Sequence, residues 1–193
     1  MIWYRLFVDD LAPALPPSAR LVDVGTGPGY LLGYLAQARP DLNLWGLDSS
    51  YGMISRARPR QQALAPEAAP RWLVADACRL PFSACVFDHL VATFTFHVWP
   101  CPADGLTELK RVLAPGGQAW VYELRREAAL ADFKYFAAEL GLPFPLVHLG
   151  FKLVGRHHAV PAPEFARVLK QVTGAPGTLR PVHQIFWRAE LAG

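Results

Sequence analysis

The chain has 193 residues, of which 52% are hydrophobic and 18% are charged, and its formal net charge is +3. This composition favours a compact globule over a disordered chain, and the length suits one domain with a sizeable core. No cluster of lysine and arginine marks a track for phosphates, so we do not expect a nucleic-acid partner. No apolar run is long enough to cross a bilayer, and the N-terminus lacks the pattern of a signal peptide.

The cysteines indicate a compartment. Cys78, Cys85 and Cys101 are odd in number and show no zinc-like spacing. We interpret them as free thiols in a reducing environment, and we therefore expect a cytoplasmic protein.

The first predicted element is a short N-terminal helix. Residues 2–12 place Leu6, Phe7 and Leu11 at helical spacing, and three prolines between positions 13 and 17 then break the chain. We expect residues 1–19 to form a cap on the domain that follows.

A glycine-rich turn follows the first predicted strand. The apolar run Leu21-Val22-Asp23-Val24 leads into Gly25-Thr26-Gly27-Pro28-Gly29, and an amphipathic helix begins after it. The glycines permit a sharp bend and let a ligand lie against bare backbone, while the helix amides point at that ligand. This stretch therefore predicts a binding site at the end of the strand.

Further strands alternate with helices up to residue 124. We expect strands at 42–47, 71–75, 87–93 and 118–124, one helix that begins after Ser50 and is shortened by Pro59, and another at 103–113. Such alternation predicts a mostly parallel sheet with helices on both faces, in which ligands bind at the carboxyl ends of the strands. Four positions fall at such ends: Gly25, Asp48, Asp76 and Thr93.

The alternation of predicted strands and helices stops at residues 126–160. Residues 128–140 have a helical pattern, and prolines and glycines then punctuate an apolar stretch. We interpret 126–160 as an insertion over the sheet edge that forms a lid on an acceptor. A further helix is expected from Pro161, and residues 179–191 can supply one or two antiparallel strands.

Two kinds of ligand compete for the glycine turn. A dinucleotide turn places its third glycine where this chain has Tyr30. Asp23 would oppose a pyrophosphate, but it suits a ligand with a cationic amine and a sulfonium. Asp48 suits ribose hydroxyls in both cases, whereas Asp76 with Ala77 favours an adenine, because a carboxylate accepts from the amino group and backbone amides donate to the ring.

At this point the sequence resembles the class I S-adenosylmethionine-dependent methyltransferases, in particular the branch that includes the ubiquinone/menaquinone biosynthesis methyltransferases. The resemblance covers roughly residues 20–124. It implies an α/β fold with a Rossmann-like, doubly wound, seven-stranded sheet. That sheet would be mostly parallel, with an antiparallel C-terminal strand and helices on both faces, in a single domain over 1–193. The motifs that carry it are Val22-Asp23-Val24-Gly25-Thr26-Gly27-Pro28-Gly29, Gly46-Leu47-Asp48-Ser49-Ser50, Ala75-Asp76-Ala77, Leu80-Pro81-Phe82, Phe87-Asp88, Phe96-His97-Val98 and Leu109-Lys110-Arg111-Val112-Leu113-Ala114-Pro115-Gly116-Gly117.

The resemblance also implies the cofactor, S-adenosylmethionine, and how it is held. Its methionine end would lie at Asp23 and the glycine backbone, its ribose at Asp48, and its adenine at Asp76. The alternative is that these aspartates are only helix caps or turn formers, but three of them at successive strand ends favour ligand binding. The full set of expected cofactor residues is Asp23, Gly25, Thr26, Gly27, Gly29, Asp48, Ser49, Met53, Asp76, Ala77, Cys78, Ala92 and Thr93.

The acceptor side is less defined. Methyl transfer needs alignment and exclusion of water, and it needs a base only if the acceptor must lose a proton early. His97, just past the fourth strand, is the candidate base, and the alternative is a histidine that packs under the substrate. No metal is expected, because the only nearby carboxylates lie on a plain helix. The expected acceptor-binding residues are Tyr4, His97, Trp99 and His148, with His157 and His158 as further candidates.

The predicted function is methyl transfer to a small organic acceptor of apolar or aromatic character. A nucleic-acid or protein methyltransferase on the same fold is one alternative, although residues 92–97 lack the Asp/Asn-Pro-Pro-aromatic run of the DNA amino-methylating enzymes. A protein that binds the cofactor without turnover is the other. We expect a monomer or homodimer without stable membrane insertion.

Overall fold

A computed structural model describes residues 3–64, 70–155, 158–174 and 178–193. Seven strands form one sheet in the order β3-β2-β1-β4-β5-β7-β6. The first five run parallel, β7 is antiparallel to β5, and β6 is antiparallel to β7. The predicted α/β fold is confirmed, and the C-terminal tail supplies both of the strands that it could. The strands are β1 (Arg20–Val24), β2 (Asn43–Asp48), β3 (Arg71–Val74), β4 (Phe87–Thr93), β5 (Leu113–Leu124), β6 (Thr178–Val182) and β7 (Phe186–Ala192).

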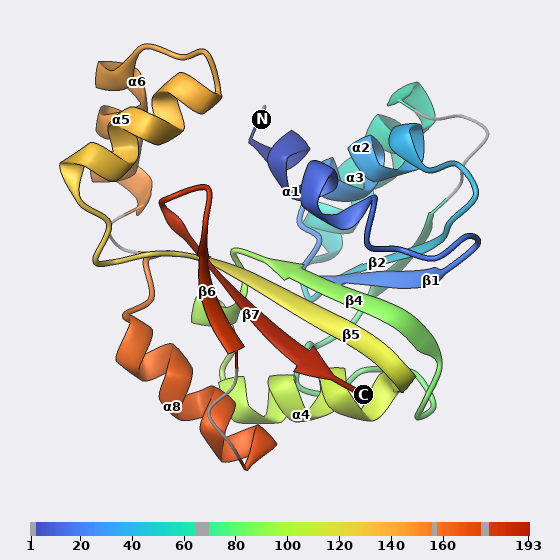
Figure 1. The fold of residues 1–193 in the computed structure, drawn as a ribbon. Helices are drawn as coiled ribbons and strands as arrows, with labels where there is room; N and C mark the ends of the chain where they lie inside the picture. The colour runs from blue at the N-terminus through green and yellow to red at the C-terminus, as the bar shows by residue number, and fades with distance from the viewer. Residues whose placement is uncertain (1–2, 65–69, 156–157, 175–177) are drawn as a thin grey trace.

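Helices cover both faces of the sheet, as Figure 1 shows. The helices on one side are α1 (Tyr4–Leu11), α2 (Tyr30–Ala38) and α3 (Tyr51–Leu64), and those on the other are α4 (Pro102–Val112) and α8 (Ala162–Thr173). Successive residues of β4 alternate between the two cores, since Leu90 and Ala92 pack with α4 and α8 while Val91 packs with α1 and α2. Strands that are apolar on both faces are what a parallel sheet between two helix layers requires.

The insertion is mostly helical over the residues that the structure describes. It contains α5 (Leu130–Glu139), α6 (Phe144–Gly150) and the π-helical turn η2 (Phe151–Gly155). It follows the carboxyl end of β5 and lies beyond the β6–β7 hairpin in Figure 1. Phe133 and Phe136 of α5 are buried in the same core as Phe7 of α1 and Phe186 of β7. The insertion is therefore packed onto the sheet layer that also carries the N-terminal helix.

Two element boundaries differ from the sequence prediction. Helix α3 continues through Pro59, although proline removes one helical hydrogen bond. The second half of the helix is held by Arg60, whose guanidinium donates to the carbonyl of Pro28 at 2.7 Å and stacks on Tyr30 at 4.0 Å. Strand β5 starts at Leu113 rather than at residue 118, because Leu113 already pairs with Phe87. Among the described residues, no helix is long and apolar enough to span a membrane.

Candidate active site

The glycine turn lies where β1 ends. Gly25, Gly27 and Gly29 have φ values of 74°, 54° and 75°, in the left-handed region that favours glycine. The amides of Gly25 and Thr26 donate to the carbonyl of Leu47 at 2.8 and 2.9 Å, which ties the turn to β2. A Cβ at Gly25 would overlap the side chain of Thr95. The turn therefore presents backbone alone toward the strand ends.

Asp23 is buried behind this turn, with a side chain only partly satisfied. Its Oδ2 accepts a hydrogen bond from the Thr26 hydroxyl at 2.7 Å, and its Oδ1 is buried without a partner among the described residues. Burial is the largest cause that raises the pKa of Asp23 to about 7, and the charge of Asp48 adds to it. An unpaired buried carboxylate oxygen is costly unless a cation or donor from outside satisfies it. The position therefore fits a cationic amine.

The other two strand-end aspartates accept hydrogen bonds from backbone amides of the loops at this edge of the sheet. Asp48 accepts from Gly27 at 2.9 Å through one oxygen and from Ser50 at 2.8 Å through the other. Asp76 is exposed and accepts from the amide of Cys78 at 2.9 Å. Each carboxylate oxygen can accept more than one hydrogen bond, so a role in shaping the loop leaves room for a ligand.

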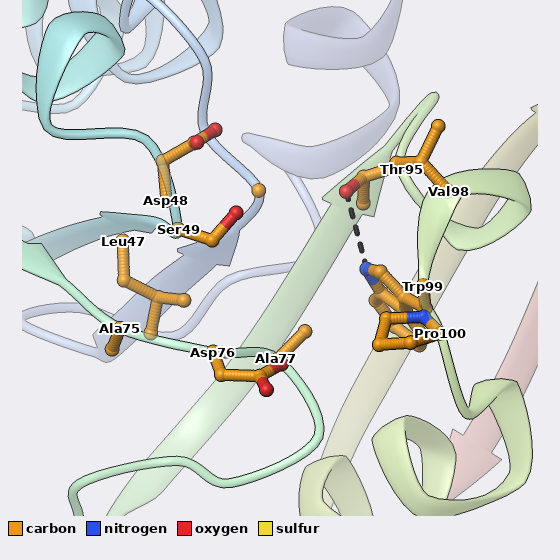
Figure 2. Close-up of a pocket in the computed structure, with 11 residues that line it drawn as sticks. Leu47, Asp48, Ser49, Ala75, Asp76, Ala77, Thr95, Val98, Trp99 and Pro100 are labelled. Carbon is orange, nitrogen blue, oxygen red and sulfur yellow. Dashed lines mark hydrogen bonds between the residues drawn. The ribbon is translucent and has the colours of Figure 1, made fainter.

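A pocket opens between the ends of β2 and β3 and the segment after β4 (Figure 2). Asp48 and Ser49 lie on one side of it, and Thr95 and Trp99 lie on the other. It is lined by Gly25, Leu47, Asp48, Ser49, Ala75, Asp76, Ala77, Thr95, Val98, Trp99 and Pro100. The structure thus brings together six predicted residues, namely Gly25, Asp48, Ser49, Asp76, Ala77 and Trp99.

Thr95 forms a wall of the pocket that the sequence prediction missed. The indole Nε1 of Trp99 donates to the Thr95 hydroxyl at 3.1 Å, and both side chains are buried. The Trp99 ring lies against Gly105 of α4, where a Cβ would collide with it. The turn η1 (Phe96–Val98) joins the two residues. No motif marks this wall, because it depends on the contact between Trp99 and a glycine of the next helix.

His97 contacts a buried glutamate that the sequence prediction also missed. Its Nδ1 lies 3.1 Å from Oε2 of Glu123, and its backbone N–H donates to Oε1 at 3.3 Å. Glu123 lies at the carboxyl end of β5 and is fully buried, which raises the pKa of its carboxyl group. On the other side of the ring, Nε2 lies 2.8 Å from Nδ1 of His158. No local signal in the sequence marks the burial of Glu123.

The remaining predicted residues lie outside the lining of the pocket. The hydroxyl of Thr93 is buried without a partner among the described residues. Tyr4 of α1 stacks on Tyr30, and burial together with the nearby Asp23 raises its pKa. His148 belongs to an aromatic cluster of the insertion, with its ring 5.4 Å from that of Phe144. His157 lies outside the described residues, and the other predicted residues beyond the lining are Asp23, Thr26, Gly27, Gly29, Met53, Cys78, Ala92 and His97.

The described part of the chain holds no group of three or more histidine, cysteine, aspartate or glutamate side chains that could bind a metal ion. The site is instead composed of backbone amides, separate carboxylates and an aromatic wall.

Comparisons with known proteins agree with this geometry. Residues 22–121 match the sequence model of a family described as a methyltransferase domain. The chain is 34% identical over 122 residues to the ubiquinone/menaquinone biosynthesis C-methyltransferase UbiE of Dinoroseobacter shibae, covering 63% of this chain and 48% of that protein. It is 38% identical over 121 residues to the demethylmenaquinone methyltransferase of Thermus thermophilus, covering 63% and 53%. The chain thus spans about half the length of these curated relatives.

The fold has counterparts among solved structures. A SAM-dependent methyltransferase from Aquifex aeolicus superposes with a TM-score of 0.72 at 19% identity, covering 95% of this chain and 87% of the other. At this identity the likeness shows the fold alone, and it agrees with the sheet order described above.

Proposed function

The chain belongs to the methyltransferase-domain family, an S-adenosylmethionine-dependent class, and on this premise we propose that it transfers a methyl group to a small organic acceptor. The observation that carries the proposal is the unpaired, buried Oδ1 of Asp23 behind the glycine turn. A buried carboxylate suits the cationic methionine end of this cofactor and would repel a pyrophosphate. The residues present therefore fit the group.

The other proposed contacts between protein and cofactor follow from the places of the residues that line the pocket. Asp48 would accept from the ribose hydroxyls, and Asp76 would accept from the adenine amino group while the Ala77 amide faces the ring. The Thr95 side chain packs against the bare backbone at Gly25, so the aminoacyl part would lie along the turn beside this contact. The methyl group would then face the ends of β4 and β5, where His97 lies.

When bound, the cofactor supplies a methyl group on a positively charged sulfur. The protein aligns the acceptor and excludes water, and the buried Thr95–Trp99 pair supports that second role. For an acceptor that must lose a proton, we propose that His97 belongs to the group of residues that acts as the base. We also propose residues 126–160 as a cover on the acceptor, because α5 shares one core with α1 and His158 contacts His97.

The names of the relatives suggest the acceptor class. Two of them are named for methylation in quinone biosynthesis, so a quinol-like aromatic acceptor is the first choice. A cytoplasmic location and a monomeric or homodimeric state remain predictions.

Calorimetry with S-adenosylmethionine and S-adenosylhomocysteine tests the cofactor. Asp48→Ala should weaken binding at least tenfold, about 1.4 kcal/mol, because two charge-assisted hydrogen bonds to the ribose are lost. Asp41→Ala is the matched control: this carboxylate also accepts from a backbone amide and an arginine, but outside the site. Equal binding by both variants, or binding of NAD in place of either adenosyl ligand, would contradict the proposal.

Release of labelled methyl groups onto an acceptor panel tests the activity. The panel should hold a naphthohydroquinone, a simple phenol, a primary amine, a tRNA and a peptide. We expect turnover on the aromatic hydroxyl compounds. Turnover on tRNA or peptide alone would favour the macromolecular alternative, and tight cofactor binding without turnover on any acceptor would favour a binding protein.

A further inference from the structure

Three groups form a continuous chain from the interior to the surface. Glu123 is fully buried, the His97 side chain is 14% exposed, and His158 is exposed. The contacts along this chain are 3.1 Å between Oε2 of Glu123 and Nδ1 of His97, and 2.8 Å between Nε2 of His97 and Nδ1 of His158. The three residues come from β5, from the turn after β4 and from the end of the insertion, shortly before α8 (Figure 1).

The partners determine where the protons lie. When Glu123 is ionised, its oxygens only accept hydrogen bonds, so Nδ1 of His97 carries a proton and Nε2 has the free lone pair. Nδ1 of His158 then carries the proton that it donates to this lone pair. Among the described residues, the ion pair formed by Glu123 is with His97. A second proton on His97 would therefore be neutralised by the carboxylate beneath it.

We propose, on the premise of the function above, that His158 takes the proton of the acceptor, that His97 stores it, and that Glu123 is the positioning residue for His97. His158 offers the accessible nitrogen of the pair, since its Nδ1 faces His97 and its ring is otherwise exposed. Glu123 holds both the ring and the backbone amide of His97, which sets the orientation of the imidazole.

The proton transfer from the acceptor through His158 to His97, which we call the relay, balances in atoms and electrons. The acceptor O–H bond breaks and a new N–H bond forms at Nε2 of His158, while the proton on Nδ1 of His158 passes to Nε2 of His97. The electron pair of the O–H bond remains on the oxygen, which forms the bond to the methyl carbon. With S-adenosylmethionine bound, the carbon–sulfur bond would break and its electron pair would go to sulfur. His97 ends as an imidazolium on the Glu123 carboxylate.

This arrangement selects a class of acceptor. A thioether or a tertiary amine has no proton to give and gains nothing from the relay. A phenol-type hydroxyl, which is mostly protonated near neutral pH, gains the most. The relay is complete only when the segment that carries His158 lies against His97, so the insertion and the base act together.

The proton positions can be measured without an acceptor or cofactor. Imidazole ¹⁵N NMR of the full chain should show His97 protonated at Nδ1. In Glu123→Gln the backbone N–H of His97 retains the amide oxygen at the Oε1 position, and the NH₂ group takes the Oε2 position, which is the nearer of the two to Nδ1 (3.1 Å against 3.3 Å). His97 should then switch to the Nε2-protonated form. Glu190→Gln is the matched control, because Glu190 lies on β7 and bonds Arg188 instead.

Kinetics test the role of His158. Because this residue is exposed, His158→Ala should fold normally. With a simple phenol as acceptor, kcat should fall roughly 10- to 100-fold at pH 7 and recover at high pH, where the phenol ionises without help, while KM for the cofactor stays within about twofold.

The outcomes separate the relay from the proposed function. Wild-type His97 protonated at Nε2, or an unchanged tautomer in Glu123→Gln, would overturn the relay even if methyl transfer is found. A pH-independent loss of kcat in His158→Ala would do the same. Absence of turnover on every acceptor would overturn the proposed function, while the NMR result would stand by itself.

Discussion

The two sides of the site, at the ends of β1, β2 and β3 and at the ends of β4 and β5, are held together by different kinds of contact. At the ends of β1, β2 and β3, the site consists of backbone amides and aspartates whose partners lie mostly within a few residues, such as Thr26 with Asp23 and Ser50 with Asp48. At the ends of β4 and β5, it consists of side chains that meet from distant segments, such as His97 with Glu123 and with His158, 26 and 61 residues away.

This difference indicates which half depends on the rest of the fold. Local contacts form whenever the strand and turn form, so the half at the ends of β1, β2 and β3, which we propose binds the cofactor and call the cofactor half, should tolerate changes elsewhere. The half at the ends of β4 and β5, which we call the proposed acceptor half, can form only when the insertion and β5 are in place. The following variants test whether the two halves are as separate as their contacts suggest.

The largest effect, on the pH dependence of stability, is expected when the ionisable group of Asp23 is removed. Burial raises its pKa from 3.8 to about 7, so between these values the folded state keeps a proton that the unfolded chain has lost. The stabilisation by this proton is complete below about pH 4 and is lost as the pH rises through about 7, amounting to roughly 4 kcal/mol. Asp23→Asn should therefore flatten the fall in stability from pH 4.5 to 7.5, measured by urea unfolding.

Asp41→Asn is the control for this experiment. Arg39 lowers the pKa of Asp41, so its contribution lies at more acidic pH and the slope above pH 4.5 should not change. An equal slope in wild type and Asp23→Asn would show that Asp23 is already ionised in the folded state. The preformed cofactor half would then carry a buried charge without a partner among the described residues.

The next effect is expected from Gly25→Ala. Its φ of 74° costs an alanine about 1–2 kcal/mol, and the new Cβ would also overlap Thr95. We expect the Kd for S-adenosylhomocysteine to rise roughly 100-fold, about 2.7 kcal/mol, by calorimetry. Gly116→Ala has a similar φ of 77° but open space around it, so it should lower stability while changing Kd less than about twofold. Similar values of Kd for both variants would show that the contact between Gly25 and Thr95 does not affect cofactor binding.

The sequence predicts where the residues of the proposed cofactor half lie, and it does so for a physical reason. A parallel sheet brings successive strand ends to one edge, so the positions of Gly25, Asp48 and Asp76 follow from strand boundaries alone. The fold follows in the same way from the alternation of apolar strands and amphipathic helices. The errors at Pro59 and at the start of β5 occur where a tertiary contact overrides a local signal, as Arg60 and the Leu113–Phe87 pair show.

The acceptor half could not be predicted to the same extent. Nothing local distinguishes Glu123 from a strand residue that faces solvent, and its burial depends on His97 and on the strands around it. The sequence predicts Trp99 as an aromatic residue near the site. Its hydrogen bond to Thr95 could not be predicted, because it depends on how the Trp99 ring packs against Gly105 of α4. His148 packs instead against aromatic rings of the insertion itself, those of Phe133 and Phe144.

The smallest effect is expected from a matched pair of core substitutions on the two sides. Phe133 in α5 packs on Phe151, and Phe165 in α8 packs on Phe96, at centroid distances of 4.3 and 4.5 Å. Replacement of either phenylalanine by leucine should cost about 1 kcal/mol of stability. Because Phe96 lies between Thr95 and His97, Phe165→Leu should weaken cofactor binding about two- to fivefold, whereas Phe133→Leu should change it less than twofold. An equal loss in both variants would mean that the insertion supports the cofactor half, and the two halves would then behave as one unit.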